Sequence, residues 1–143
     1  MKYMLDTSPF NRLADGLLKV EELPPGSELV ATYVQIEEIN RTKDEQRRLQ
    51  LLITFTHLEP TMEHTASFIW GKTPWGLAPF GIGESFNELK AELDFRNKSK
   101  PSNTNDALIA ETALTKGYGL VTADRDLAEV FAKRSAHVMH VAA

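Results

Sequence analysis

The chain has 143 residues, 42% of them hydrophobic, and we expect residues 1–143 to form one domain with a single core. Its net charge of −4 excludes a protein that holds nucleic acid by bulk positive charge alone, and the absence of Cys excludes thiol catalysis, disulfides and cysteine-based zinc sites. The sequence contains no run of about 18 apolar residues, so no membrane span is predicted. No apolar segment follows a positively charged N-terminal segment, so no signal peptide is predicted. We therefore expect a cytoplasmic protein with no membrane partner.

The first half of the chain alternates β-prone runs with helical patterns. Residues 2–5 are predicted to form a short buried strand, and Ser8 is a suitable cap for the helix that follows. Residues 28–33 predict a second strand. Residues 34–58 then continue as helical sequence that is charged in the middle and apolar at its end.

The second half repeats this alternation after an irregular segment. Residues 71–83, rich in Gly, Pro and Trp, predict a structured loop, since the aromatic side chains require burial. Strands that alternate with helices favour an α/β domain of three α/β/α layers, with a central, mainly parallel sheet. The remaining predicted elements are two helices, a strand, a third helix and a last strand, at 86–93, 105–116, 119–122, 127–131 and 137–141.

Acidic residues lie where the predicted strands end. Asp6 ends the first strand, Asp124 lies two residues beyond the strand GLVT (119–122), and Asp106 is in the first turn of the helix that feeds that strand. Glu37 and Glu38 are about 100° apart on the helix leaving the second strand, so at most one faces the site. Because ligands bind at the carboxyl ends of parallel strands, these acids are expected to converge on one edge.

Crowded carboxylates repel one another and raise one another's pKa, and a divalent cation relieves that repulsion. Oxygen-only ligands suit Mg²⁺ or Mn²⁺, which keep several waters and share their remaining positions with phosphate. The arrangement therefore predicts metal-assisted hydrolysis of a phosphodiester, a reaction that needs no His or Ser nucleophile.

Each acid also has a structural alternative that the sequence leaves open. Asp106 in the first turn of a helix is favoured by the helix dipole, and Asp6 and Asp124 could serve as caps or turn residues. Asp126, with a Glu three residues further on, is expected first to cap the following helix and only second to be a peripheral ligand. Arg125, between two acids, is a candidate contact for a phosphate backbone.

The chain contains three blocks, MLDTSPFNRL, TYVQIEEI and NDALIAETALTKGYGLVTADRDL. In this order they resemble the signature blocks of PIN-domain nucleases, in particular the VapC-type toxins of toxin–antitoxin pairs. The resemblance implies a PIN-like fold and favours Glu38 over its neighbour. It places the catalytic, metal-binding acids of the family at Asp6, Glu38, Asp106 and Asp124. Ser8 stands where the family commonly has Asn, and Thr122 is positioned to orient an acid.

The resemblance further implies an RNA substrate, a homodimer and, for a toxin, a small antitoxin protein that blocks the acidic pocket. The expected function is therefore a Mg²⁺- or Mn²⁺-dependent endoribonuclease. Residues in supporting roles would be Ser8, Thr122, Arg125 and Asp126. One alternative is a catalytically inactive PIN-like binding module in an RNA-processing assembly. Another is a phosphotransfer domain in which Asp6 is phosphorylated, and Ser at position 8, where a second Asp would be needed, counts against it.

Overall fold

The computed structural model describes residues 1–67 and 84–141, so the loop predicted over 71–83 lies outside the described residues. Within the described part, five parallel strands form one sheet in the order β3-β2-β1-β4-β5. The strands are β1 (Lys2–Leu5), β2 (Glu28–Ala31), β3 (Thr61–Met62), β4 (Gly119–Thr122) and β5 (Val138–His140). The predicted α/β class with a parallel central sheet is confirmed.

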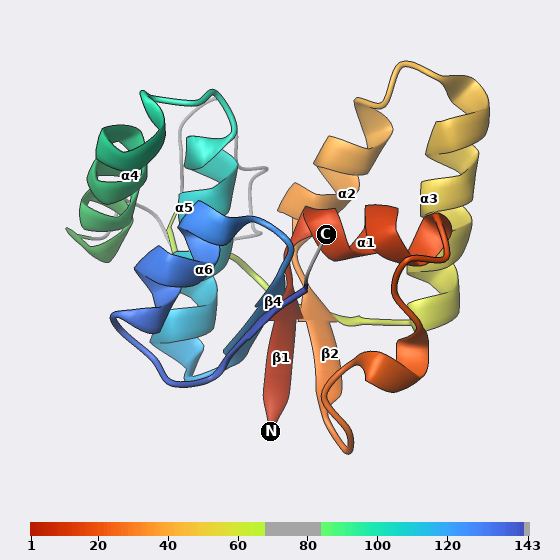
Figure 1. Ribbon diagram of the computed structural model, residues 1–143, viewed down its shortest axis with the longest axis horizontal. Coiled ribbons are helices and arrows are strands. Elements are labelled where there is room, and N and C mark those ends of the chain that lie inside the picture. The colour runs from red at the N-terminus through yellow and green to blue at the C-terminus, as the bar shows by residue number, and fades with distance from the viewer. Residues whose placement is uncertain (68–83, 142–143) are drawn as a thin grey trace.

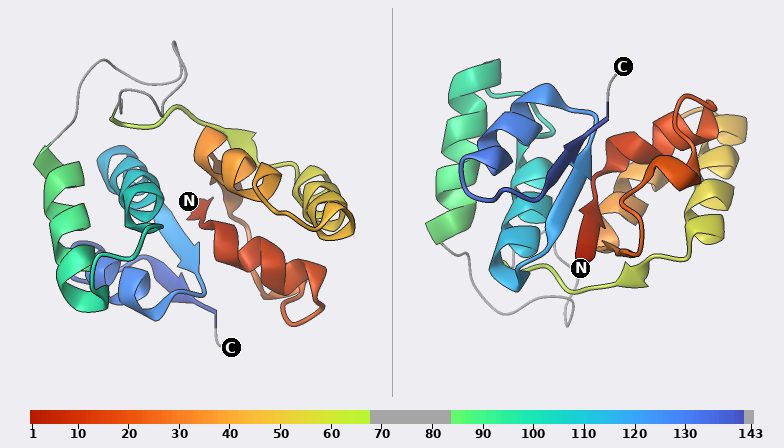
Figure 2. Two further views of the ribbon diagram at one scale, coloured as in Figure 1. Left: turned by 90° about the horizontal axis from the view of Figure 1, so that it is seen from above. Right: turned by 60° about the horizontal axis from the view of Figure 1, so that its bottom comes forward.

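Helices cover both faces of this sheet, with α4, α5 and α6 on one side of it and α1, α2 and α3 on the other (Figures 1 and 2). The three-layer arrangement predicted from the alternation of strands and helices is therefore confirmed. No helix in the described ranges has both the length and the apolar composition that crossing a bilayer requires. The helices are α1 (Thr7–Ala14), α2 (Tyr33–Asn40), α3 (Glu45–Leu58), α4 (Glu84–Asn97), α5 (Asn103–Lys116) and α6 (Arg125–Ala132), with a 3₁₀ turn at Val20–Glu22.

The sheet separates two apolar cores because successive side chains of a strand point to opposite faces. Met4 and Leu120 pack with α4, α5 and α6, whereas their neighbours Leu5 and Val121 pack with α1 and α3. All four side chains are fully buried. Strands whose neighbouring apolar side chains are buried on both faces are typical of a parallel sheet covered on both sides.

The register of the central strands decides which residues meet at the carboxyl edge. In β1, Leu5 pairs with Val121 of β4, and the backbone N–H of Asp6 donates to the Val121 carbonyl at 2.9 Å. The residue that follows β1 therefore lies beside Thr122, the last residue of β4. Two positions far apart in the chain are joined directly by this pairing.

Three helix boundaries differ from the prediction, each because an Asp lies one position ahead of the first turn. Asp6, not Ser8, caps α1, and its side chain accepts the first backbone N–H of the helix. Asp44 accepts two backbone N–H groups, at 3.0 and 3.2 Å, so α3 begins anew instead of continuing α2. Asp124 caps α6. Asp126 lies inside the first turn of this helix, so the prediction that Asp126 caps it is wrong.

Candidate active site

Four acids reach the carboxyl edge of the sheet from four different elements. Asp6 follows β1, Glu38 is on α2, Asp106 is in the first turn of α5, and Asp124 precedes α6. All four line a single cavity of about 290 Å³. The structure thus brings together the acids singled out in the sequence and includes Glu38 of the adjacent pair, whereas Glu37 does not line this cavity.

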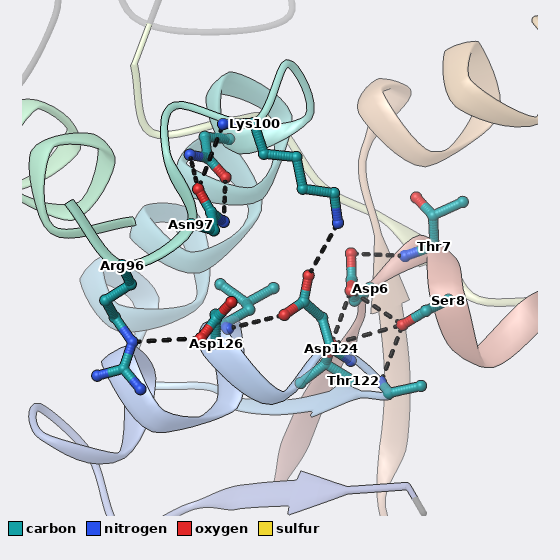
Figure 3. A network of polar contacts seen from close by, with 12 residues as sticks. Asp6, Thr7, Ser8, Arg96, Asn97, Lys100, Thr122, Asp124 and Asp126 are labelled. Carbon is teal, nitrogen blue, oxygen red and sulfur yellow. Dashed lines mark hydrogen bonds and ion pairs between the residues drawn. The ribbon is translucent and has the colours of Figure 1, made fainter. Parts of the chain in front are cut away.

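Asp6 is buried, and hydrogen bonds hold both of its carboxylate oxygens. Its Oδ1 accepts from the backbone N–H of Thr7 at 2.8 Å. Its Oδ2 accepts from the hydroxyls of Thr122 at 2.7 Å and Ser8 at 3.1 Å (Figure 3). Burial raises the pKa of Asp6, and these three hydrogen bonds act in the opposite direction. The carboxylate is therefore fixed in place by hydrogen bonds, and no cation within residues 1–67 and 84–141 forms an ion pair with it.

The Thr122 hydroxyl connects two of the four acids. While it donates to Asp6, it accepts from the backbone N–H of Asp124 at 3.0 Å. The Ser8 hydroxyl likewise accepts from the backbone N–H of Ala123 at 2.9 Å. These bonds join β1, α1 and the β4–α6 connection, so they orient Asp6 relative to Asp124.

Asp106 is buried in the same cavity among the other acids. Burial, followed by the charges of Asp6, Glu38 and Asp124, raises the pKa of Asp106 to about 9. Glu38 is held by a hydrogen bond in which its Oε1 accepts from the Thr7 hydroxyl at 2.9 Å. The raised pKa values of Asp6 and Asp106 mean that the metal-free cavity favours a protonated acid over a full set of ionised carboxylates.

One cation lies close to this group of acids. The Lys100 ammonium is 3.6 Å from Oδ2 of Asp124, while Oδ1 of Asp124 accepts from the backbone N–H of Leu127 at 3.1 Å (Figure 3). Lys100 lines the acidic cavity and lowers the pKa of Asp106, against the larger effects of burial and the neighbouring acids.

The donors of the cavity fit a hard divalent cation in type, because carboxylate and hydroxyl oxygens are the ligands that Mg²⁺ and Mn²⁺ take in proteins. The buried Ser102 hydroxyl also lines the cavity and has no hydrogen-bond partner in the described part of the chain, so it could serve a ligand. Among residues 1–67 and 84–141, however, no group of three His, Asp or Glu side chains is arranged to hold a metal ion.

Two predicted supporting residues lie elsewhere than expected. The side chain of Arg125 is 83% exposed, pairs with Glu129 at 3.2 Å and lines neither this cavity nor the adjoining one. Asp126 lines only the adjoining cavity, of about 490 Å³, and pairs with Arg96 at 3.5 Å. Both differences arise because α6 begins at position 125, so these side chains project from its first turn.

Sequence reasoning did not find four other residues of the cavity, namely Thr7, Asn11, Lys100 and Ser102. Asn11 is on α1, one turn beyond Thr7, so a helix drawn from the Asp6 cap would have placed it on the same side as Thr7. Lys100 and Ser102 belong to a polar loop between two helices, and no periodic pattern in that loop indicates which side chains face the sheet.

Comparisons with known proteins identify the fold. No family model matches the sequence, and no curated protein matches it either. Among solved structures, a member of the VapBC family of toxin–antitoxin systems, VapBC-5 from Mycobacterium tuberculosis, matches over 99% of this chain and 98% of its own, with a TM-score of 0.50 and 19% identity. The chain has the fold of VapBC-5.

A second structure, FitAcB from Neisseria gonorrhoeae, matches over 96% of both chains with 14% identity and a TM-score of 0.42, which is too low to support an argument. The likeness to VapBC-5 confirms the expected resemblance to VapC-type PIN domains at the level of the fold. At such low identity it says nothing of individual residues, so the roles of the four acids depend on the geometry of this chain.

Proposed function

We propose that this protein is a divalent-metal-dependent endoribonuclease and the toxin of a type II toxin–antitoxin pair. The observation that supports the reaction is the convergence of Asp6, Glu38, Asp106 and Asp124 on one cavity at the carboxyl edge of a parallel sheet. Four acids within one small cavity cost stability unless they serve a ligand of opposite charge.

The four carboxylates would hold Mg²⁺ or Mn²⁺, which supplies a bound water of lowered pKa and neutralises charge on the phosphate. Thr122 and Ser8 keep the Asp6 carboxylate oriented toward the cavity, and the Thr7 hydroxyl does the same for Glu38. Because burial and the neighbouring acids raise the pKa of Asp106, cation binding would release protons to solvent.

The fold supports the remaining parts of the proposal. VapBC-5 is described as a member of a toxin–antitoxin family, and its fold is shared over nearly the full length of both chains. On this basis we propose RNA as the substrate, a small antitoxin protein as the partner, a homodimer as the assembly and the cytoplasm as the location.

One observation favours a second candidate, a catalytically inactive PIN-like binding module. Because no three acidic or His side chains in the described ranges are arranged to hold a metal ion, the cavity could instead accept a basic group of a protein partner. The Lys100 ammonium, 3.6 Å from the Asp124 carboxylate, is an example of a basic group that lies against these acids.

Isothermal titration of Mn²⁺, followed by RNA cleavage with and without the metal, separates the two candidates. We expect the wild-type protein to bind Mn²⁺ and to cleave, Asp106→Asn to do neither, and Glu37→Gln, an equal change of charge outside the cavity, to do both. Cleavage that persists in EDTA or in Asp106→Asn would exclude the proposed mechanism. A wild-type protein that neither binds metal nor cleaves RNA, but binds a partner tightly, would establish the binding module.

A further inference from the structure

The acidic cavity continues into a second cavity, of about 490 Å³, along α1 and the start of α6. The two cavities share four lining residues, Ser8, Asn11, Lys100 and Asp124, and so form one groove. Lys100 lies at their junction, with its ammonium 3.6 Å from the Asp124 carboxylate (Figure 3).

A preorganised turn presents Lys100 to this groove. Lys98 and Ser99 both have left-handed backbones, with φ of 58° and 57°, a conformation that side chains other than Gly rarely adopt. Asn97 holds the turn by accepting from the backbone N–H of Lys100 at 3.3 Å and by exchanging side-chain hydrogen bonds with Asn103 at 3.0 and 2.8 Å. Asn103 in turn donates to an α4 carboxylate at 2.8 Å.

The ion pair with Asp124 does not explain why the chain forms this strained turn before Lys100. The Lys100 side chain is 53% exposed and that of Asp124 is 22% exposed, and an ion pair this close to solvent stabilises a protein little. Two consecutive residues with left-handed backbones cost more free energy than such an ion pair contributes. Strain of this kind is found at sites where a side chain must be held in a set position.

The charges lining the second cavity leave it open to an anion. Its two other acids are already paired, Asp15 with Arg47 at 2.7 Å and Asp126 with Arg96 at 3.5 Å. Arg12, which also lines it, forms no ion pair within the described ranges. The buried Ser102 hydroxyl, two residues from Lys100, has no partner among the described residues and can donate to an oxygen in the acidic cavity.

We propose that Lys100 is a substrate-positioning residue that binds a phosphate of a single-stranded nucleic acid at the junction of the two cavities. The neighbouring phosphate then passes along the second cavity toward Arg12. A compact ammonium group suits this position because it meets phosphate oxygens from several directions without a required orientation. The inference rests on the proposed nuclease function and adds the path by which the strand crosses the acidic cavity.

The first test measures binding without catalysis. A fluorescein-labelled single-stranded RNA oligonucleotide is titrated with Asp106→Asn protein in EDTA over a series of KCl concentrations, with and without Lys100→Gln. Loss of one phosphate contact makes the slope of log Kobs against log[KCl] shallower by about 0.7. Lys98→Gln removes the same charge from the same turn but lines neither cavity, so it is expected to leave the slope unchanged.

The second test measures Mn²⁺-dependent cleavage in the otherwise wild-type protein. We expect Lys100→Gln to raise KM roughly tenfold with little change in kcat, because the contact is made equally in the bound substrate and in the transition state. Lys100→Arg keeps the positive charge, so it should return KM most of the way to the wild-type value. If Lys100 served only a structural ion pair with Asp124, the salt slope of the first test would not depend on it.

The outcomes separate this inference from the proposed function. If the wild-type protein cleaves RNA and Lys100→Gln alters neither slope nor KM, or if Lys98→Gln alters both equally, the role of Lys100 is wrong and the nuclease stands. If the wild-type protein does not cleave but the slope depends on Lys100, the nuclease is wrong and the phosphate contact stands. If there is neither cleavage nor binding, both are overturned.

Discussion

The substitution Asp106→Asn should stabilise the metal-free protein, and the gain should grow with pH. Burial and three neighbouring acids raise the pKa of Asp106 from 3.8 to about 9. Between these two values, the native carboxyl carries a proton that the unfolded chain has lost. Folding therefore takes up a proton at this position, and the stability of the wild-type protein falls as pH rises through this range.

The magnitude follows from the linkage between protonation and folding. One proton bound only by the native state lowers the free energy of unfolding by at most about 1.4 kcal/mol for each pH unit. From roughly pH 5 to pH 8, both within the range set by the two pKa values, the loss reaches up to about 4 kcal/mol. Asn has nearly the shape of the protonated acid and does not titrate, so the variant avoids this loss.

Urea unfolding followed by circular dichroism, in EDTA at several pH values across this range, measures the effect. The difference in unfolding free energy between Asp106→Asn and wild type should be small near the acidic end and several kcal/mol near the alkaline end. Glu37→Gln is the matched control, because it removes one carboxylate next to Glu38 but outside the cavity. Its stability relative to wild type should change little with pH.

A particular result would refute the reasoning. If Asp106→Asn were no more stable than wild type at the alkaline end, the carboxyl would not be penalised by its surroundings. The same would follow from a difference that stays constant with pH. Either result would remove the electrostatic argument for a cation site at this edge of the sheet.

Three further substitutions test the site and the sheet around it. Glu38→Gln should abolish Mn²⁺-dependent RNA cleavage and Glu37→Gln should retain it. The opposite result would mean that Glu37, not Glu38, is the metal ligand. Thr122→Val deprives a buried carboxylate and a backbone N–H of their partner, so urea unfolding should show a loss of about 1–3 kcal/mol. Gly119→Ala places a Cβ against the Tyr3 ring and 2.9 Å from the backbone oxygen of His137, so its unfolding free energy should fall by about 1–3 kcal/mol. An unchanged value would mean that both the ring and the backbone of β5 yield to the new methyl group.

Local patterns in the sequence were enough to predict the fold class and four of the five strands, but they missed the two-residue edge strand β3. Apolar runs such as GLVT lie in the buried strands, and their alternation with helices predicts the parallel sheet that β1, β2 and β4 form. Asp6 lies one residue and Asp124 two residues beyond the end of a strand, so their meeting at one edge follows from parallel topology alone. These predictions need only short-range periodicity and one rule about how parallel strands align.

Choices between neighbouring residues needed the tertiary structure. Periodicity left Glu37 and Glu38 open, and the resemblance favoured Glu38, but only the packing of α2 against α1 brings Glu38 to the Thr7 hydroxyl. Arg125 and Asp126 follow an acid of the site in sequence, yet the start of α6 directs them away from the acidic cavity.

Long-range contacts and burial were likewise decided only in three dimensions. The bond between Thr122 and Asp6 joins residues 116 positions apart, and Lys100 reaches Asp124 from a loop without any periodic signal. The pKa of Asp106 depends on exclusion from water and on three acids brought in by other elements. Sequence by itself determined which residues end the strands; the chemistry of the site depends on distances and solvent exclusion, which arise only when those strands and helices pack together.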